Sequence, residues 1–313
     1  MEGIMMRGPL GSAVALRLPD GSIDVEPQEE KHLSQKYAFA KWPIVRGCIA
    51  FFESLYYGYR YLMLSAEKTA LDGVELEATE EDSKFDQWMA AHLGEHMMKI
   101  ISVLSVILGV ALALFLFLYI PMWLVDLFDK YVTSGVLEAH NLHALLEGIL
   151  KIIILVIYMK AVSRTKEIKR VFMYHGAEHK TISCYENGLE LTVENVREQT
   201  RFHPRCGTSF IFVLLLIGIL IYTLLSFLIP GIGTHRALWM LLKLVLLPLI
   251  MGFGYEFIKW AGRSDSILAK IGSAPGLWMQ RITTAEPTDD MIEIGIAAFN
   301  AVRTDNPEDD KLC

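Results

Sequence analysis

The chain has 313 residues, of which 53% are hydrophobic, and its mean hydropathy is +0.35. This composition is too apolar for an ordinary soluble globular protein. The formal net charge of −7 argues against a nucleic-acid-binding protein, which would present a basic face. The four cysteines are scattered without regular spacing, which argues against a disulfide scaffold.

Residues 1–41 do not resemble a membrane segment. Residues 12–18 and 23–26 partly alternate apolar with polar side chains, and the Pro-Asp-Gly-Ser sequence at 19–22 is a turn signal between them. This pattern predicts a cytoplasmic β-hairpin. We expect no signal peptide, because the N-terminus lacks an apolar core of sufficient length.

Residues 42–98 combine an aromatic-rich stretch with an acidic loop. Phe and Tyr are frequent in residues 42–66, but Arg46, Glu53 and Arg60 interrupt the apolar run. A spanning helix would have to hide these charges from lipid at a high free-energy cost. We therefore predict an amphipathic helix that lies in the membrane interface, with aromatic rings at headgroup depth.

A His-x-x-Glu-His sequence occurs at His92, Glu95 and His96, directly before the first long apolar run. We interpret these three residues as polar side chains at the water boundary. A part in a metal site is the alternative interpretation.

Four apolar runs are long enough to cross about 30 Å of hydrocarbon. The first two runs are residues 100–123 and 142–162, which together form a membrane region at 99–162. The other two are residues 208–229 and 237–258, which form a second membrane region at 208–258. The fold class that we predict is mainly α: a polytopic helical membrane protein with about four transmembrane helices, an interfacial helix and a small cytoplasmic α+β element.

The distribution of basic residues predicts the orientation. Residues 160–206 hold nine Lys or Arg, whereas the connection before the second run contributes Lys130 and the turn before the fourth run contributes Arg236. Because cytoplasmic loops carry the excess of basic residues, residues 163–207 and both termini are expected in the cytoplasm.

The cytoplasmic segment 163–207 contains a second His-x-x-Glu-His sequence. His175 and His179 are four residues apart, so a helix would project both imidazoles from one face, with Glu178 beside them. His203 and Cys206 follow in the same segment. Imidazole nitrogen and thiolate sulfur are the ligands that zinc prefers, so the segment predicts a divalent metal site, with zinc as the expected ion.

Two roles for this site remain open on the sequence. If His175 and His179 bind metal together with His203 or Cys206, one position stays open to water, and Glu178 would polarise that water as a general base. If Glu178 and all the other residues are ligands, the site is closed and structural.

Local patterns predict the remaining cytoplasmic elements. Residues 182–193, with Asn-Gly at their centre, predict a β-hairpin, and residues 194–201 predict a short helix. Residues 259–313 begin with a Gly-rich polar stretch broken by Ala-Pro-Gly at 274–276 and contain a C-terminal amphipathic helix that starts near Thr288. We expect an acidic tail after this helix.

Three motifs resemble those of the YqhQ-like family of bacterial membrane proteins, and the resemblance extends over nearly the whole chain. They are MYHGAEHK at 173–180 with ENV at 194–196, FHPRCGTSF at 202–210, and EGIMMRG at 2–8. The family is a domain family of unknown function, sometimes labelled as predicted metal-dependent enzymes. The resemblance implies a multi-span protein of the bacterial cytoplasmic membrane and implies no particular reaction.

The resemblance also bears on single residues. His175, Glu178, His179, His203 and Cys206 match the family motifs position by position, whereas His92 and His96 match none.

At the N-terminus, Glu2 and Arg7 match the family signature. A buried Glu–Arg pair that holds the hairpin to the core would explain them as well as a catalytic role would. Glu256, near the cytoplasmic end of the fourth run, is a further candidate ligand, although we prefer a glutamate at the interface.

Two functions therefore follow from the sequence. The first is a metal-dependent hydrolase at the cytoplasmic membrane face, with membrane lipid as a partner and no nucleic acid. The second is a non-enzymatic transporter, channel or membrane scaffold with a structural metal or histidine cluster in its cytoplasmic cap. It is motivated by Glu147 in the second apolar run and by Lys243 and Glu256 in the fourth. Assembly into a homo-oligomer is compatible with either function. The sequence specifies neither the substrate nor the number of copies.

Overall fold

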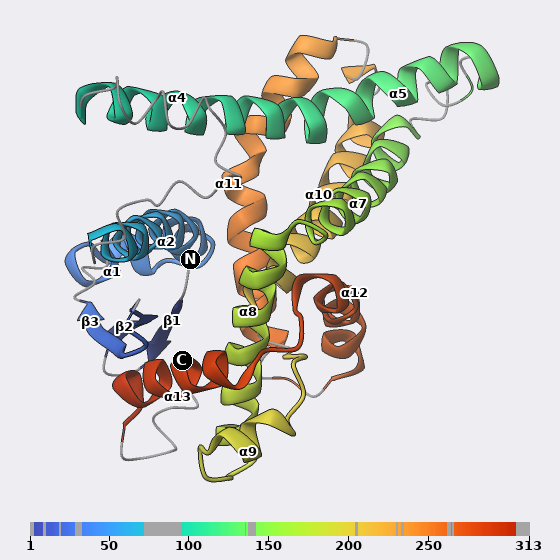
Figure 1. The fold of residues 1–313 in the computed structure, drawn as a ribbon. Helices are drawn as coiled ribbons and strands as arrows, with labels where there is room; N and C mark the ends of the chain where they lie inside the picture. Colours follow the sequence, from blue (N-terminus) through green and yellow to red (C-terminus); the bar gives the residue numbers. More distant parts are fainter. Residues whose placement is uncertain are drawn as a thin grey trace.

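A computed structural model describes the chain in several stretches (Figure 1). They are residues 3–8, 11–18, 20–28, 33–71, 95–134, 136, 142–203, 206–229, 231–232, 235–261, 264 and 266–304. The predicted loop at 72–86, the C-terminal tail at 306–313, Glu2 and His92 lie outside these residues.

The described chain is mainly helical and carries one small sheet. The strands are β1 (Gly3–Gly8), β2 (Gly11–Arg17) and β3 (Ile23–Gln28). The helices of the first half are α1 (Leu33–Lys36), the 3-10 helix η1 (Ala38–Lys41), α2 (Val45–Leu71), α4 (Glu95–Leu114), α5 (Ile120–Phe128), and the π-helical segments η2 (Phe115–Tyr119) and η3 (Asp129–Thr133). The later helices are α7 (His143–Val162), α8 (Lys166–Glu186), α9 (Val193–Arg197), α10 (Gly207–Leu228), α11 (Arg236–Ala261), α12 (Ile267–Thr283) and α13 (Asp289–Val302).

The N-terminal sheet extends the predicted hairpin by one strand. β2 is the central strand, and both β1 and β3 pair with it in antiparallel orientation. The sequence analysis missed β1, which includes Arg7. The turn between β2 and β3 is the predicted one, and Gly21 in it has a φ of +86°.

The sheet is covered by α13, the predicted C-terminal amphipathic helix. Its buried side chains Met291, Ile294 and Ala298 share one core with Ala13 and Ala15 of β2. The helix α8 packs against the same α13, and Ala177 belongs to the same core. The N-terminal sheet, α13 and α8 thus share one hydrophobic core, and α8 is the element that carries the His-x-x-Glu-His motif.

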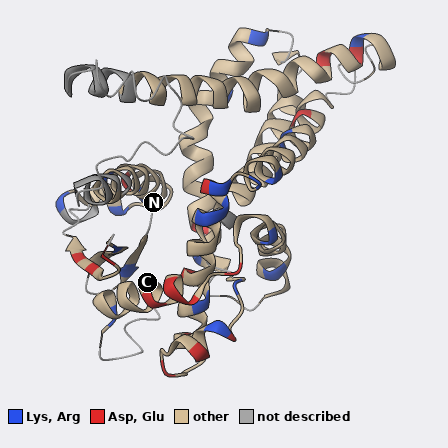
Figure 2. Cartoon of the chain, in the orientation of Figure 1, with Lys and Arg blue, Asp and Glu red and all other residues tan. Residues whose placement is uncertain are grey.

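A second group of elements is the helix bundle of α7, α10, α11 and α12. α10 packs against each of the other three. In Figure 1, α11 is seen lengthwise, with α7 and α10 beside it and α8 below them. Figure 2 shows α11 with few charges along its length, whereas Lys and Arg gather where α8 begins.

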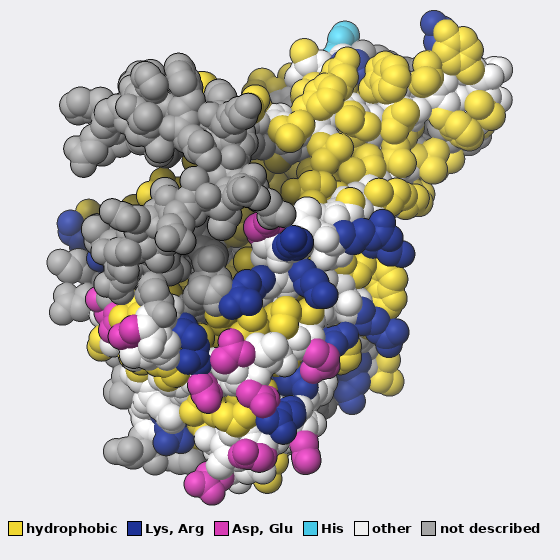
Figure 3. Space-filling view, viewed as in Figure 1, with side chains coloured by type: hydrophobic (Ala, Val, Ile, Leu, Met, Phe, Trp, Pro, Cys, Tyr) yellow, Lys and Arg dark blue, Asp and Glu magenta, His cyan; other side chains and the backbone are white. Residues whose placement is uncertain are grey.

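Three described helices are long and apolar enough to cross a membrane. They comprise residues Val103–Thr133, Phe210–Leu228 and Arg236–Ala261. The second predicted run, α7, does not count among them because Glu147, Lys151 and Lys160 interrupt it. Figure 3 shows apolar side chains covering the surface formed by α5, α7 and α10, with Lys and Arg along the lower margin of that surface.

Two predicted local structures are wrong. Residues 182–193 form no hairpin, because α8 continues to Glu186 and the next regular element is α9. Residues 267–283 are the helix α12 rather than a polar break, although Pro275 lies inside it. A proline in a helix removes one backbone hydrogen bond, which packing against neighbouring helices offsets here.

Candidate metal site

The first two residues of the site come from the middle of α8. His175 and His179 lie one helical turn apart on the same face, and their ring centroids are 4.4 Å apart. Both residues lie well inside α8, which runs from Lys166 to Glu186. His179 is buried and His175 is partly buried.

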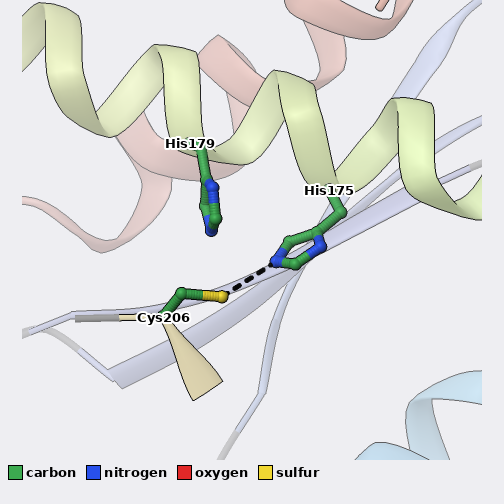
Figure 4. Close-up of side chains that lie close together, drawn as sticks. All are labelled: His175, His179 and Cys206. Carbon is green, nitrogen blue, oxygen red and sulfur yellow. Dashed lines mark hydrogen bonds between the residues drawn. The ribbon is translucent and has the colours of Figure 1, made fainter. Parts of the chain in front are cut away.

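The third residue is Cys206, which directly precedes α10. Its Sγ lies 3.2 Å from His175 Nε2 (Figure 4), and one donor atom from each of the three residues lies within 4.8 Å of the others. In tetrahedral zinc sites the ligand atoms are about 3 to 4 Å apart, as follows from metal–ligand distances of about 2.0–2.3 Å. The two clusters of the sequence therefore meet in one place, with a donor set that suits zinc.

Both imidazole rings are oriented by backbone carbonyl groups. Nδ1 of His175 lies 2.9 Å from the carbonyl oxygen of Thr283, and Nδ1 of His179 lies 2.6 Å from that of Arg201. A carbonyl accepts but cannot donate, so each Nδ1 carries a proton, and in the neutral ring Nε2 is then the nitrogen whose lone pair would bind a metal. Metal-binding histidines commonly have this second hydrogen bond, which fixes the ring and its tautomer.

The charges of the three residues favour a thiolate. Burial alone would raise the pKa of Cys206, but hydrogen bonds with His175 and His179 outweigh it and lower that pKa to about 5. Burial alone would lower the pKa of His175, but the hydrogen bond and charge of Cys206 raise it to about 9. Cys206 also stands at the N-terminus of a long helix, where the helix dipole favours an anion.

Glu178 lies beside the cluster but is not one of the three close donors. It is partly buried, and burial raises the pKa of its carboxyl above the ordinary value, although the nearby charges of His175 and His179 oppose this shift. The charge of Cys206 also raises the pKa of the Glu178 carboxyl, and the charge of His203 lowers it. A raised carboxyl pKa beside a metal site suits a group that takes up and releases a proton.

His203 is close to this cluster but turned toward another partner. Its ring centroid is 5.8 Å from that of His179, and its Nε2 lies 3.2 Å from a carboxylate oxygen of Glu186. Of the two predicted alternatives for the third ligand, Cys206 is the one that the structure places with His175 and His179.

The remaining sequence candidates lie elsewhere or outside the described residues. Glu256 forms an ion pair with Arg46 of α2 and accepts a hydrogen bond from the backbone N–H of Ile44. Arg7 is exposed in β1, and Glu2, its partner in the predicted pair, lies outside the described residues. The side chains of Glu95 and His96 lie outside the described part of the structure.

Sequence analysis missed the residues outside the two motif clusters that hold the site residues in place. Thr283 and Gln280 come from α12, in the stretch interpreted as a polar break. Lys180, in the motif itself, is buried and pairs with Glu286 at 2.8 Å, and Glu286 also pairs with Arg201 at 2.9 Å.

The fold and the site together define a mainly helical protein with three helices apolar enough to cross a membrane and a His–His–Cys cluster beside them. Residues 42–305 match the family described as "Protein of unknown function (DUF1385)", and the chain belongs to this family. The chain is 34% identical over 303 residues to the "Uncharacterized protein YqhQ" of Bacillus subtilis (strain 168), which covers 96% of this chain and 89% of that relative. The resemblance noted in the motifs is thereby confirmed. No solved structure matches the chain.

Proposed function

We propose that the protein is a membrane-embedded, zinc-dependent hydrolase whose site lies at the cytoplasmic face of a bacterial inner membrane. The observation that carries the proposal is the convergence of His175, His179 and Cys206 within 4.8 Å, with both imidazole Nδ1 atoms held by carbonyl groups. Three protein donors leave a fourth position, which is the arrangement of catalytic rather than structural zinc sites.

In this proposal each residue has a separate task. His175, His179 and Cys206 hold the metal, which when bound would lower the pKa of a coordinated water. Glu178, whose carboxyl pKa is raised by burial, would be the general base beside such a water and would return the proton to the leaving group. His203 stays outside the first coordination shell and contacts Glu186.

The membrane part of the proposal rests on the apolar helices and on charge distribution. A protein with four transmembrane helices would have to include α7 as one of them, although α7 carries charged residues. The structure supports this assignment because Glu147 forms a buried ion pair with Lys243 of α11, and Lys151 lies 3.9 Å from the same carboxylate. The Lys and Arg residues at the start of α8 favour the cytoplasm for the site and both termini.

The test is the metal content of detergent-purified protein, measured by elemental mass spectrometry. We expect about one zinc per chain in the wild type, loss of zinc in His175→Ala and Cys206→Ser, and retention in His203→Ala and in the remote control His235→Ala. Glu178→Gln should keep zinc and lose the hydrolytic activity found in a substrate screen. Wild-type protein without metal after purification free of chelator would overturn the proposal, and loss of zinc from Glu178→Gln would make the site structural.

A second candidate function, transport through the bundle, is favoured by the buried pair itself. One carboxylate oxygen of Glu147 is buried without a hydrogen-bond partner among the described residues, and both Lys151 and Lys243 lie near the ring of Tyr222. Intramembrane charges of this kind commonly mark ion or proton pathways. Proton flux in proteoliposomes that disappears in Glu147→Gln, while zinc content stays normal, would favour this function over the hydrolase.

A further inference from the structure

The helix α12 has two faces with different roles. Its buried residues Ala269, Gly276, Gln280 and Thr283 follow the spacing i, i+7, i+11 and i+14, which is one side of an α-helix. This side packs against the site-proximal ends of two bundle helices: Met279 shares a core cluster with Phe212 and Leu155. It also supports the candidate site, since the carbonyl of Thr283 accepts from His175.

The opposite side of α12 is apolar and exposed. Ile267, Ile271, Ala274 and Trp278 follow the spacing i, i+4, i+7 and i+11, and the three large side chains are 75%, 64% and 50% exposed. Leu268 beside them is also exposed. A helix that is apolar on both sides is covered on both sides, either by protein or by lipid.

The charged residues at the edge of this apolar side indicate whether protein or lipid covers it. Lys270 and Arg281 are exposed and eleven residues apart, so they lie along one edge of the stripe. Long basic side chains at the edge of an apolar helix face extend toward lipid phosphates, and tryptophan is enriched at the same depth. The chain as a whole is acidic, with a net charge of −7, so two copies would repel one another at long range.

The position of α12 in the fold agrees with a lipid cover. It packs closely on α11, because a Cβ at Gly272 would lie 2.3 Å from the ring of Phe257. α10 and α11, the helices that α12 packs against, also carry exposed large apolar side chains, Ile211 at the start of α10 and Trp260 at the end of α11. In Figure 1, α12 lies beside α8, next to the ends of α7 and α10.

From these observations we propose that α12 is an in-plane membrane helix whose stripe, Ile267, Ile271, Ala274 and Trp278, is covered by the lipid leaflet. Its other face holds the candidate metal site at that lipid surface through Thr283 and Gln280. This inference rests on the membrane location in the proposed function but not on the presence of a metal.

The test uses the full-length protein in nanodiscs of phosphatidylethanolamine and anionic phosphatidylglycerol. The photoreactive residue p-benzoylphenylalanine is incorporated at Ile271 and, separately, at Trp278, and the adducts formed on illumination are identified by mass spectrometry. The matched controls are Leu220, exposed in the middle of α10, and Glu293, exposed on α13. We expect lipid adducts at Ile271, Trp278 and Leu220 and none at Glu293.

The controls separate failure of this inference from failure of the proposed function. Lipid adducts at Leu220 but not at Ile271 or Trp278 would overturn the inference alone. Cross-links from Ile271 or Trp278 to a second copy of the chain would overturn it in favour of a dimer interface. Absence of lipid adducts at Leu220 as well would overturn the membrane location on which both proposals stand. Because Ile271 and Trp278 are exposed positions, either one still reports if the other variant fails to assemble.

Discussion

The side chain of Gln280 bonds to both polar groups of the His203 backbone. Its Oε1 accepts from the His203 N–H at 2.8 Å, and its Nε2 donates to the His203 carbonyl at 2.7 Å. Gln280 is fully buried, and His203 lies three residues before Cys206. This paired contact fixes the loop that brings Cys206 to the histidines of α8.

Gln280→Leu should therefore loosen the candidate site. The substitution keeps the volume roughly constant but leaves the buried N–H of His203 without its partner, at a cost of about 1–3 kcal/mol. The His203 carbonyl also loses the Gln280 hydrogen bond and keeps the longer one from the Cys206 N–H at 3.4 Å. We expect a lower melting temperature in detergent and weaker zinc retention during dialysis against a chelator. Gln28→Leu, whose side chain makes one long contact of 3.4 Å with Glu26, is the control and should change neither quantity. Normal zinc retention in Gln280→Leu would show that the loop holds Cys206 without this contact.

In metal-free protein, Cys206 should be a thiolate at neutral pH although its side chain is buried. Because the pKa of Cys206 is lowered to about 5, its thiolate form persists as the pH falls from about 8 to about 6. The rate of alkylation by iodoacetamide, followed by peptide mass spectrometry, should stay nearly constant over that interval and decline near pH 5. Cys184, whose pKa is raised by burial, is an internal control that should react only at alkaline pH. A rate for Cys206 that climbs about tenfold per pH unit up to pH 8 would contradict the assigned charge state.

The sequence identified the residues that the structure brings together better than it identified the secondary-structure elements around them. His175 and His179 have a spacing that produces a shared helix face in any helix, so their pairing required no tertiary information. The Asn-Gly sequence at 187–188 was ambiguous, because the same turn chemistry serves a hairpin and a helix end. Gly188 has a φ of +70° and follows the last turn of α8, where a left-handed residue commonly terminates a helix.

The error at α12 has a different cause. Glycine and proline within residues 267–283 lower helix propensity, and propensity was the only local signal available there. Packing against α10 and α11 decides the structure, and Gly272 is required where α12 approaches Phe257. Gln280 contacts the backbone of His203, and Thr283 contacts His175 through its own carbonyl, so neither contact could be identified from a sequence motif.

Glu286→Gln should affect stability in a pH-dependent manner. Burial alone would raise the pKa of Glu286, but Lys180 and Arg201 outweigh it and hold the pKa below its ordinary value. A carboxyl with a depressed folded pKa contributes stability above its unfolded pKa of about 4.3, and this contribution disappears as the pH falls through the folded value. The Glu286 side chain is largely exposed, so solvent screening limits the effect to about 1 kcal/mol or less.

The measurement for Glu286 is the melting temperature of both proteins at about pH 7 and about pH 3.5. Glu286→Gln should melt below the wild type at the higher pH, and the difference should shrink at the lower pH. Glu190→Gln, at an exposed position, is the matched control and should show no difference at either pH. A difference that grows on acidification would contradict the ion-pair explanation.

Gly176, inside the His-x-x-Glu-His motif, should not tolerate alanine even though alanine favours helices. A Cβ at this position would lie 2.0 Å from the carbonyl oxygen of Ala285, a backbone atom that cannot rotate away. Ala285 is held along α8 by its N–H, which donates to the carbonyl of Phe172 at 2.8 Å. The displaced segment includes Thr283, whose carbonyl orients His175. Gly176→Ala should therefore lower both the melting temperature and the zinc content.

Gly58→Ala in α2 is the matched control for this substitution. Among the described residues, a Cβ at Gly58 would meet no atom within 4 Å, so only the helix propensity changes, and alanine should add about 0.5–1 kcal/mol of stability. The two variants make the same chemical change within helices and are expected to differ in the sign of their effect on the melting temperature. A Gly176→Ala variant that also melted higher and kept its zinc would contradict the close approach of α8 and the segment after α12. The orientation of His175 by the Thr283 carbonyl would then have to be abandoned.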